Sequence, residues 1–158
     1  MWDLYTQGAL KGMDDYAGTM RSLILKDRSI TRLPSLKSHF VEVIGRELRG
    51  DGLSCSATQE FSNWMYENSN RCPGIRLSYE VWHQIVKNKT DVLQDSDMED
   101  YQHLINLPYV DVITLDRRMT GYVAQAAKRM GMDIKGRICK SVVDILDENK
   151  PCGRKTVV

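Results

Sequence analysis

Three aspartates in one stretch of the chain have the residue type and spacing that metal-dependent chemistry needs. Asp97 and Asp100 are three residues apart, so on a helix their carboxylates lie one turn apart on the same face. Asp116 follows an apolar run, and open α/β sheets place their sites beyond the carboxyl ends of such strands. Mg²⁺ and Mn²⁺ prefer oxygen ligands and need only one or two direct carboxylates. The pattern therefore indicates a divalent-cation site formed by these aspartates.

The elements that must position the aspartates can be predicted from the residues around them. Ser96 and Glu99 have the spacing of a capping box, which predicts that a helix starts at Asp97. Pro108 blocks continuation of that helix. The apolar, β-branched run 109–115 then predicts a strand covered on both faces, as in a parallel sheet.

A second helix is expected soon after this strand. Apolar residues recur with helical period over 119–130, and Gly131 is well placed as the C-terminal cap. A purely structural explanation of the aspartates stays open beside the metal site. Asp97 and Asp100 would then favour a helix N-terminus through its dipole, and Asp116 would cap the second helix.

The segment DMEDYQHL at 97–104, followed by LPYVDVITLDRRM at 107–119, resembles the carboxyl half of PIN-domain proteins, especially bacterial PIN-like ones. The resemblance implies a three-layer α/β fold, rich in helix, with a small parallel sheet. It also implies a metal-dependent ribonuclease, in which acidic residues hold Mg²⁺ or Mn²⁺ that activates a water to cut a phosphodiester. Asp97 and Asp100 match the family's third acidic position, and Asp116 matches the fourth.

Glu47 is the candidate for the family's second acidic position. Leu36 and Phe40 belong to an apolar helical stripe, and if the helix continues past Gly45 its rotation places Glu47 on that stripe. A carboxylate on a buried face must be paired, protonated or bound to a metal. Glu42, on the opposite face, stays an alternative, as does a helix that frays at Gly45 with Glu47 in solvent.

The chain opens with Trp2 and Leu4, without the strand that ends in an essential Asp in PIN-like proteins. Asp3 does not match that acid. The resemblance therefore implies that the first central strand and its Asp are missing. Such a loss would impair nuclease activity and leave neighbouring strands open to self-association. Whatever the family, Trp2 is expected to anchor a first helix.

Length and composition predict one domain over residues 1–147 and a mobile tail at 148–158. The chain carries 22 basic and 21 acidic side chains, so no strong global field draws it to nucleic acid. Its four cysteines lack the spacing of a zinc site and are expected to be reduced, in the cytoplasm. No signal peptide and no membrane-spanning apolar run is present in the sequence.

Local patterns predict the remaining elements. A helix is expected over 14–25, and Ser56 with Gln59 has the spacing of another capping box. The residues 72–74 predict a turn, after which Ser78 would open the next helix. A short strand is expected within 134–139.

Several other polar residues near the aspartates could form ion pairs or bind a ligand. Asp111 lies inside the predicted strand, where a buried carboxylate needs a partner such as Arg117 or Arg118. These arginines could instead hold a phosphate. His103 is expected at the surface or bonded to one of the carboxylates.

The expected function is thus hydrolysis of RNA, with Asp97, Asp100 and Asp116 holding Mg²⁺ or Mn²⁺ and Glu47 supporting them. The alternatives are a non-catalytic PIN-like module that binds a protein partner, and an inactive fragment. Self-association into a homo-oligomer is expected if no other segment replaces the missing strand. No membrane partner is expected.

Overall fold

The computed structural model describes residues 15, 18–30, 34–50, 52, 54–94, 96–132, 137–139 and 141, apart from the side chains of Glu47, Met98 and Arg137. Residues 18–29 are helical. After them come α2 (Leu36–Gly50), α3 (Cys55–Glu67), α4 (Pro73–Lys87), α5 (Ser96–His103), the 3₁₀ turn η1 (Leu107–Tyr109), β1 (Val112–Thr114), α6 (Arg117–Met130) and β2 (Arg137–Cys139). The predicted tail at 148–158 and the Trp2 anchor lie outside the described residues.

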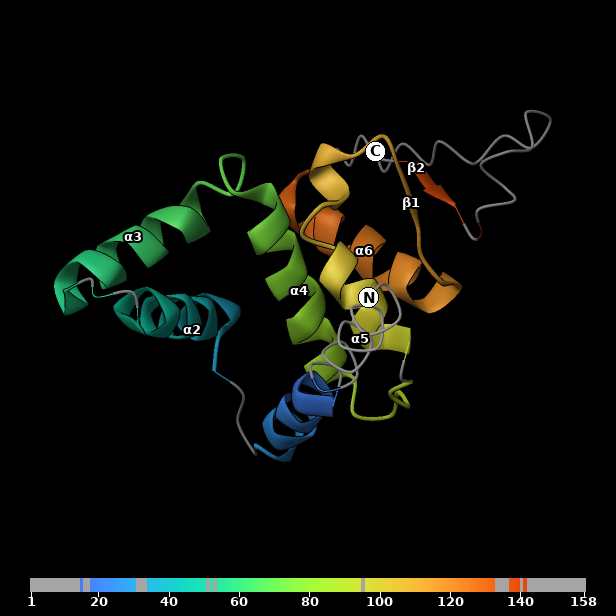
Figure 1. The fold of residues 1–158 in the computed structure, drawn as a ribbon, viewed down its shortest axis with the longest axis horizontal. Coiled ribbons are helices and arrows are strands. Elements are labelled where there is room, and N and C mark those ends of the chain that lie inside the picture. Colours follow the sequence, from blue (N-terminus) through green and yellow to red (C-terminus); the bar gives the residue numbers. More distant parts are fainter. Residues whose placement is uncertain are drawn as a thin grey trace, which may run out of the picture.

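The helix α4 lies at the centre of the fold, between the α2–α3 pair and the elements that carry the aspartates (Figure 1). Its residues Leu77, Val81 and Ile85 are buried and belong to the main apolar core. Met119 and Val123 of α6 lie in the same core. The helix α6 therefore packs against α4, and this packing fixes the position of Asp116 at the start of α6.

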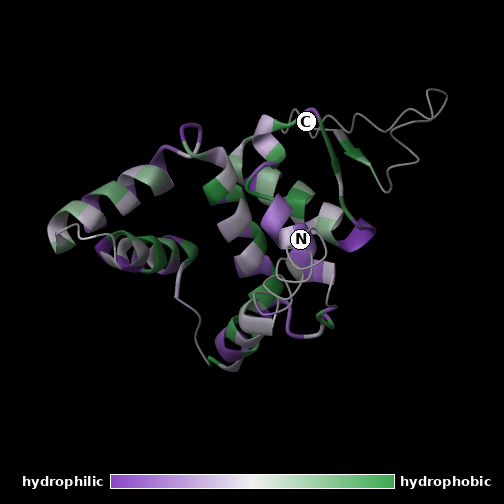
Figure 2. Ribbon diagram, viewed as in Figure 1, coloured by the Kyte–Doolittle hydropathy of each residue, from purple (hydrophilic) through white to green (hydrophobic). Residues whose placement is uncertain are grey.

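The α2–α3 pair has a smaller apolar core of its own. Phe40 and Val41 of α2 are buried with Met65 of α3, and Tyr79 of α4 packs against this cluster. Hydrophobic and hydrophilic residues alternate along α2, as an amphipathic helix requires (Figure 2). The buried residues of the described chain thus form two clusters, and residues of α4 pack in both.

The prediction of a helix-rich α/β fold with a small parallel sheet is confirmed. β1 and β2 pair in parallel, with Ile113 opposite Ile138 and Thr114 opposite Cys139. α6 connects them, because parallel strands need a crossover rather than a tight turn. The three-layer PIN-like arrangement stays a prediction, since the described residues contain only this two-stranded sheet.

The predicted strand at 109–115 is too long. Pro108 lies in η1, and Tyr109 ends this turn with 65% of its surface exposed. Proline fixes its own φ and has no N–H to donate, which suits the start of a helical turn better than a central strand. The strand covers only 112–114, and its residues are half-buried rather than covered on both faces.

Two predicted helix starts are wrong. α3 is capped by Ser54, whose side chain accepts a hydrogen bond from the N–H of Ala57, and not by Ser56. α4 begins at Pro73 and passes through Ser78, because proline fits the first turn of a helix. Gly74 lets this turn approach the backbone of Ile105: a Cβ on Gly74 would lie 2.0 Å from the Ile105 carbonyl oxygen.

The helix after Asp116 is confirmed. α6 ends at Gly131, which adopts the left-handed conformation at φ 61° and donates its N–H to the last carbonyls. Asp116 is the N-cap, and its carboxylate accepts from the N–H of Met119 at 2.5 Å. The structural role that the sequence leaves open for Asp116 is therefore real.

The cysteines differ from expectation. Cys139 is disulfide-bonded, so the prediction that every thiol is reduced is wrong at this residue. Cys55 and Cys72 are free. Among the described residues, no helix has both the length and the apolar character to cross a membrane.

Candidate functional site

Asp100 and Asp116 meet at the carboxyl end of β1. The backbone N–H of Asp116 donates to Oδ2 of Asp100 at 3.3 Å. Asp100 lies on α5, and Asp116 lies between β1 and α6. Two of the three predicted ligands are thus brought together at the strand end, where sites of open α/β sheets form.

Two carboxylate oxygens remain available at this point. Oδ2 of Asp100 accepts from Asp116, and Oδ1 of Asp116 accepts from Met119. Oδ1 of Asp100 and Oδ2 of Asp116 accept no hydrogen bond within the described part of the chain. These oxygens suit a hydrated Mg²⁺ or Mn²⁺, which keeps several waters and takes one or two carboxylates.

The surroundings of Asp100, including the charge of Asp116, shift its pKa. Burial raises the pKa of Asp100, and the negative charge of Asp116 raises it further. The hydrogen bond from the Asp116 backbone opposes this change, but the net pKa still lies above the usual value. Burial first and the Asp116 carboxylate second therefore disfavour the charged form of Asp100.

Asp97 does not join the pair in this conformation. Its side chain is 2% exposed, and Oδ1 makes an ion pair with Nη2 of Arg118 but no hydrogen bond. Oδ2 accepts from the backbone N–H of Gln94 at 2.7 Å. Both oxygens are therefore engaged with groups that a metal would have to displace. The role of Asp97 as a direct ligand stays a prediction that requires Arg118 to move.

The helix that carries Glu47 lies away from these carboxylates. α2 is continuous from Leu36 to Gly50, so it does not fray at Gly45. However, α2 packs against α3 and α4, and α4 lies between it and α5 (Figure 1). α2 therefore lies apart from α5, and the role of Glu47 stays a prediction. Glu42 is exposed on the same helix.

The neighbouring polar residues differ in their roles. Asp111 precedes β1 and is exposed, so it needs no buried partner. Arg118 is engaged by acidic groups, whereas Arg117 is exposed at the first position of α6. His103 is exposed in the last turn of α5, where its charge lowers the pKa of Asp100. Arg117 is thus the better candidate for contact with a phosphate.

Sequence reasoning misses the polar network behind the site. Oδ2 of Asp91 accepts from the Tyr122 hydroxyl at 2.7 Å and from Nη1 of Arg118 at 2.8 Å. Burial alone would raise the pKa of Asp91, but these hydrogen bonds outweigh it and hold the pKa below the usual value. Asn88 donates in turn to the Tyr122 hydroxyl. No periodicity marks Asp91 or Asn88, because both lie in the polar connection between α4 and α5.

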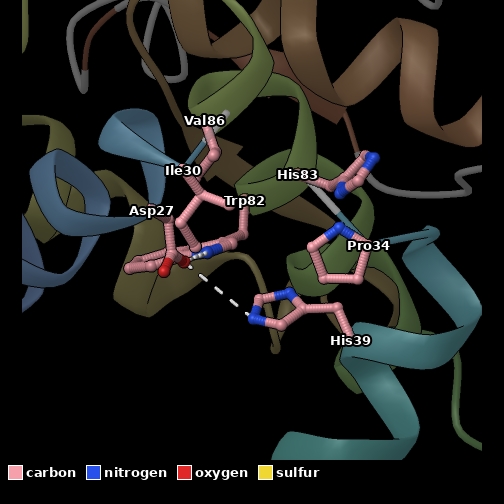
Figure 3. Close-up of a pocket in the computed structure, with 7 residues that line it drawn as sticks. All are labelled: Asp27, Ile30, Pro34, His39, Trp82, His83 and Val86. Atoms are coloured by element: carbon pink, nitrogen blue, oxygen red, sulfur yellow. Dashed lines mark hydrogen bonds and ion pairs between the residues drawn. The ribbon is translucent and has the colours of Figure 1, made fainter. Parts of the chain in front are cut away.

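A second polar cluster lies on the other side of α4, in a cavity of about 20 Å³. Oδ2 of Asp27 accepts from Nε1 of Trp82 at 3.3 Å and lies 3.9 Å from Nε2 of His39. The His39 ring points toward Asp27 (Figure 3). Burial, together with the charges of Lys87, His39 and Arg129, lowers the pKa of His83 to about 4. A cavity of this volume has room for roughly one water molecule.

No protein-family model, curated protein or solved structure matches the chain. Within the part of the chain that the structure describes, no three His, Cys, Asp or Glu side chains are grouped so that they could hold a metal ion. Among the described residues, Asp100 and Asp116 thus have no third carboxylate beside them to complete a cage. The resemblance to PIN-domain proteins rests on the sequence motif alone.

Proposed function

We propose that this protein is a PIN-like ribonuclease that uses a divalent cation, Mg²⁺ or Mn²⁺, held by Asp100 and Asp116. The observation that carries the proposal is that Asp100 and Asp116 meet at the carboxyl end of β1, where the backbone N–H of Asp116 donates to the Asp100 carboxylate at 3.3 Å. The motif that resembles PIN-domain proteins contains both residues. Position, ligand type and motif thus support the same site.

The chain's own residues would orient the site. Asp116 is fixed by its capping bond to Met119, and its N–H orients the Asp100 carboxylate. A bound divalent cation lowers the pKa of a coordinated water and stabilises negative charge on phosphate oxygens. Arg117, exposed beside Asp116, would bind an RNA phosphate bidentately. We further propose a cytoplasmic location, a protein partner and a homo-oligomer for this chain.

A non-catalytic PIN-like interaction module is the second candidate. Its specific support is the ion pair of Asp97 with Arg118, which occupies an acid that matches the family's third position. The described residues also contain no group of three side chains that could hold a metal ion. Both observations support a PIN-like fold that does not cleave RNA. The two candidates differ in whether RNA is cleaved.

Cleavage of a labelled single-stranded RNA in Mn²⁺ distinguishes them. Wild type should cleave, and Asp100→Asn and Asp116→Asn should each reduce the rate by about a hundredfold, since each removes one of the proposed ligands. Asp111→Asn is the matched control, because Asp111 is exposed beside the same strand. Cleavage that survives both substitutions would contradict the proposed site. No cleavage by folded wild type would favour the interaction module.

A further inference from the structure

The guanidinium of Arg118 is surrounded by oxygens from three residues. Nη1 donates to Oδ2 of Asp91 at 2.8 Å and to the backbone carbonyl of Val92 at 2.7 Å, and Nη2 makes the ion pair with Oδ1 of Asp97. Two carboxylates and a main-chain carbonyl are the ligand types that Ca²⁺ takes in proteins. Here a side-chain cation from α6 contacts all three oxygens.

The oxygens are held by bonds that do not involve Arg118. The Tyr122 hydroxyl donates to the Asp91 carboxylate at 2.7 Å, and the N–H of Gln94 donates to the Asp97 carboxylate at 2.7 Å. Nη1 of Arg28 donates to the backbone carbonyl of Asp91 at 2.7 Å. The arrangement of oxygens is therefore prepared by the connection between α4 and α5, and removing Arg118 leaves these supports in place.

Charge and burial require a cation at this position. The Asp97 side chain is 2% exposed and that of Asp91 is 16% exposed, while Arg118 is 23% exposed. Arg28 adds a positive charge from the helix at 18–29, which also lowers the pKa of Asp91. Without Arg118, the buried Asp97 carboxylate would lose its ion pair, and an uncompensated charge in a buried place is costly.

We propose that Asp91, Val92 and Asp97 form a calcium-type oxygen site whose built-in occupant is the guanidinium of Arg118. A divalent cation competes with Arg118 for these oxygens and binds well only when the guanidinium is gone. The proposal does not depend on the ribonuclease function, since the site shares no ligand with Asp100 and Asp116. It also explains why Asp97 does not join them.

Terbium luminescence tests the proposal, because Tb³⁺ occupies calcium-type sites and the nearby Tyr122 can sensitise it. Arg118→Met should bind Tb³⁺ about tenfold or more tightly than wild type, since a competing charge is removed, and Ca²⁺ should displace the Tb³⁺. Arg117→Met, an exposed neighbour on the same helix, should behave as wild type. Equal affinity in Arg118→Met and wild type would overturn the proposal.

Second substitutions in the Arg118→Met background locate the ion. Adding Asp97→Asn should abolish the gain in affinity, and adding Asp116→Asn should leave it intact. A gain that survives Asp97→Asn, or that Asp116→Asn removes, would place the ion elsewhere and overturn the proposal while leaving the ribonuclease proposal open. If Arg118→Met is unfolded without metal, millimolar Ca²⁺ should restore its circular dichroism, and failure to restore it would equally contradict the site.

Discussion

The backbone N–H of Asp116 donates to the carboxylate of Asp100 across 3.3 Å, while the carboxylate of Asp116 caps α6. Asp116 thus bonds α5 to the segment that follows β1, and it also caps α6. Asp116→Asn keeps an N-cap of similar quality, whereas Asp116→Ala loses it and should cost about 1 kcal/mol of unfolding free energy. Urea denaturation of the two variants measures the difference. Equal stability of the two would show that the cap contributes nothing.

Gly74 is required by the close approach of α4 to the turn after α5. A Cβ at this position would lie 2.0 Å from the backbone oxygen of Ile105, which has no flexible end that could move aside. Gly74→Ala should therefore destabilise the protein by about 2 kcal/mol or more. Gly121→Ala is the control, since a Cβ there meets nothing within 4 Å in α6. The free energy of unfolding of Gly121→Ala should rise by about 0.5–1 kcal/mol. Thermal unfolding of both variants measures these changes, and equal stability of Gly74→Ala and wild type would contradict the close approach.

His83 should make the fold sensitive to acid. Burial and the charges of Lys87, His39 and Arg129 lower its pKa in the folded state to about 4, against 6.5 as its usual value. The unfolded chain then binds the proton more tightly between these values, so stability should fall as pH drops from about 6.5 to about 4.

The measurement is the melting temperature of wild type and His83→Gln at pH 7 and pH 5. Solvent screening of this half-buried group reduces the effect to about 1 kcal/mol, or roughly 3 °C. The drop between the two pH values should be smaller by that amount in His83→Gln. An identical drop in both proteins would assign the acid sensitivity to other groups.

The sequence predicts best where one local signal decides the structure. The apolar period of α6 and the glycine after it give the helix and its left-handed cap at Gly131. The start of α4 is missed because Pro73 and Gly74 are typical of turns as well as of a first helical turn. Only the tertiary contact with Ile105 explains the glycine.

In the candidate site too, local signals predict some features, and tertiary contacts determine the rest. Helical spacing places Asp97 and Asp100 on one face of α5, but it cannot predict which element faces each carboxylate. Asp116 reaches Asp100, and Arg118, two residues later, reaches Asp97. The backbone of the N-cap residue thus contacts one acid and a side chain in the first turn of α6 contacts the other, although the two acids look equivalent in the sequence. Asp91 escapes prediction because its partners come from residues distant in the chain.

Calorimetric titration with Mn²⁺ tests most directly whether Asp100 and Asp116 hold a cation. Wild type should bind one Mn²⁺ weakly, with a dissociation constant of about 0.1–1 mM, since the site offers two carboxylates and otherwise water. Asp116→Asn, which keeps the helix cap, should abolish this binding, and the exposed Asp111→Asn should not change it. Equal Mn²⁺ affinity in wild type and Asp116→Asn would contradict the proposed site and the function that depends on it.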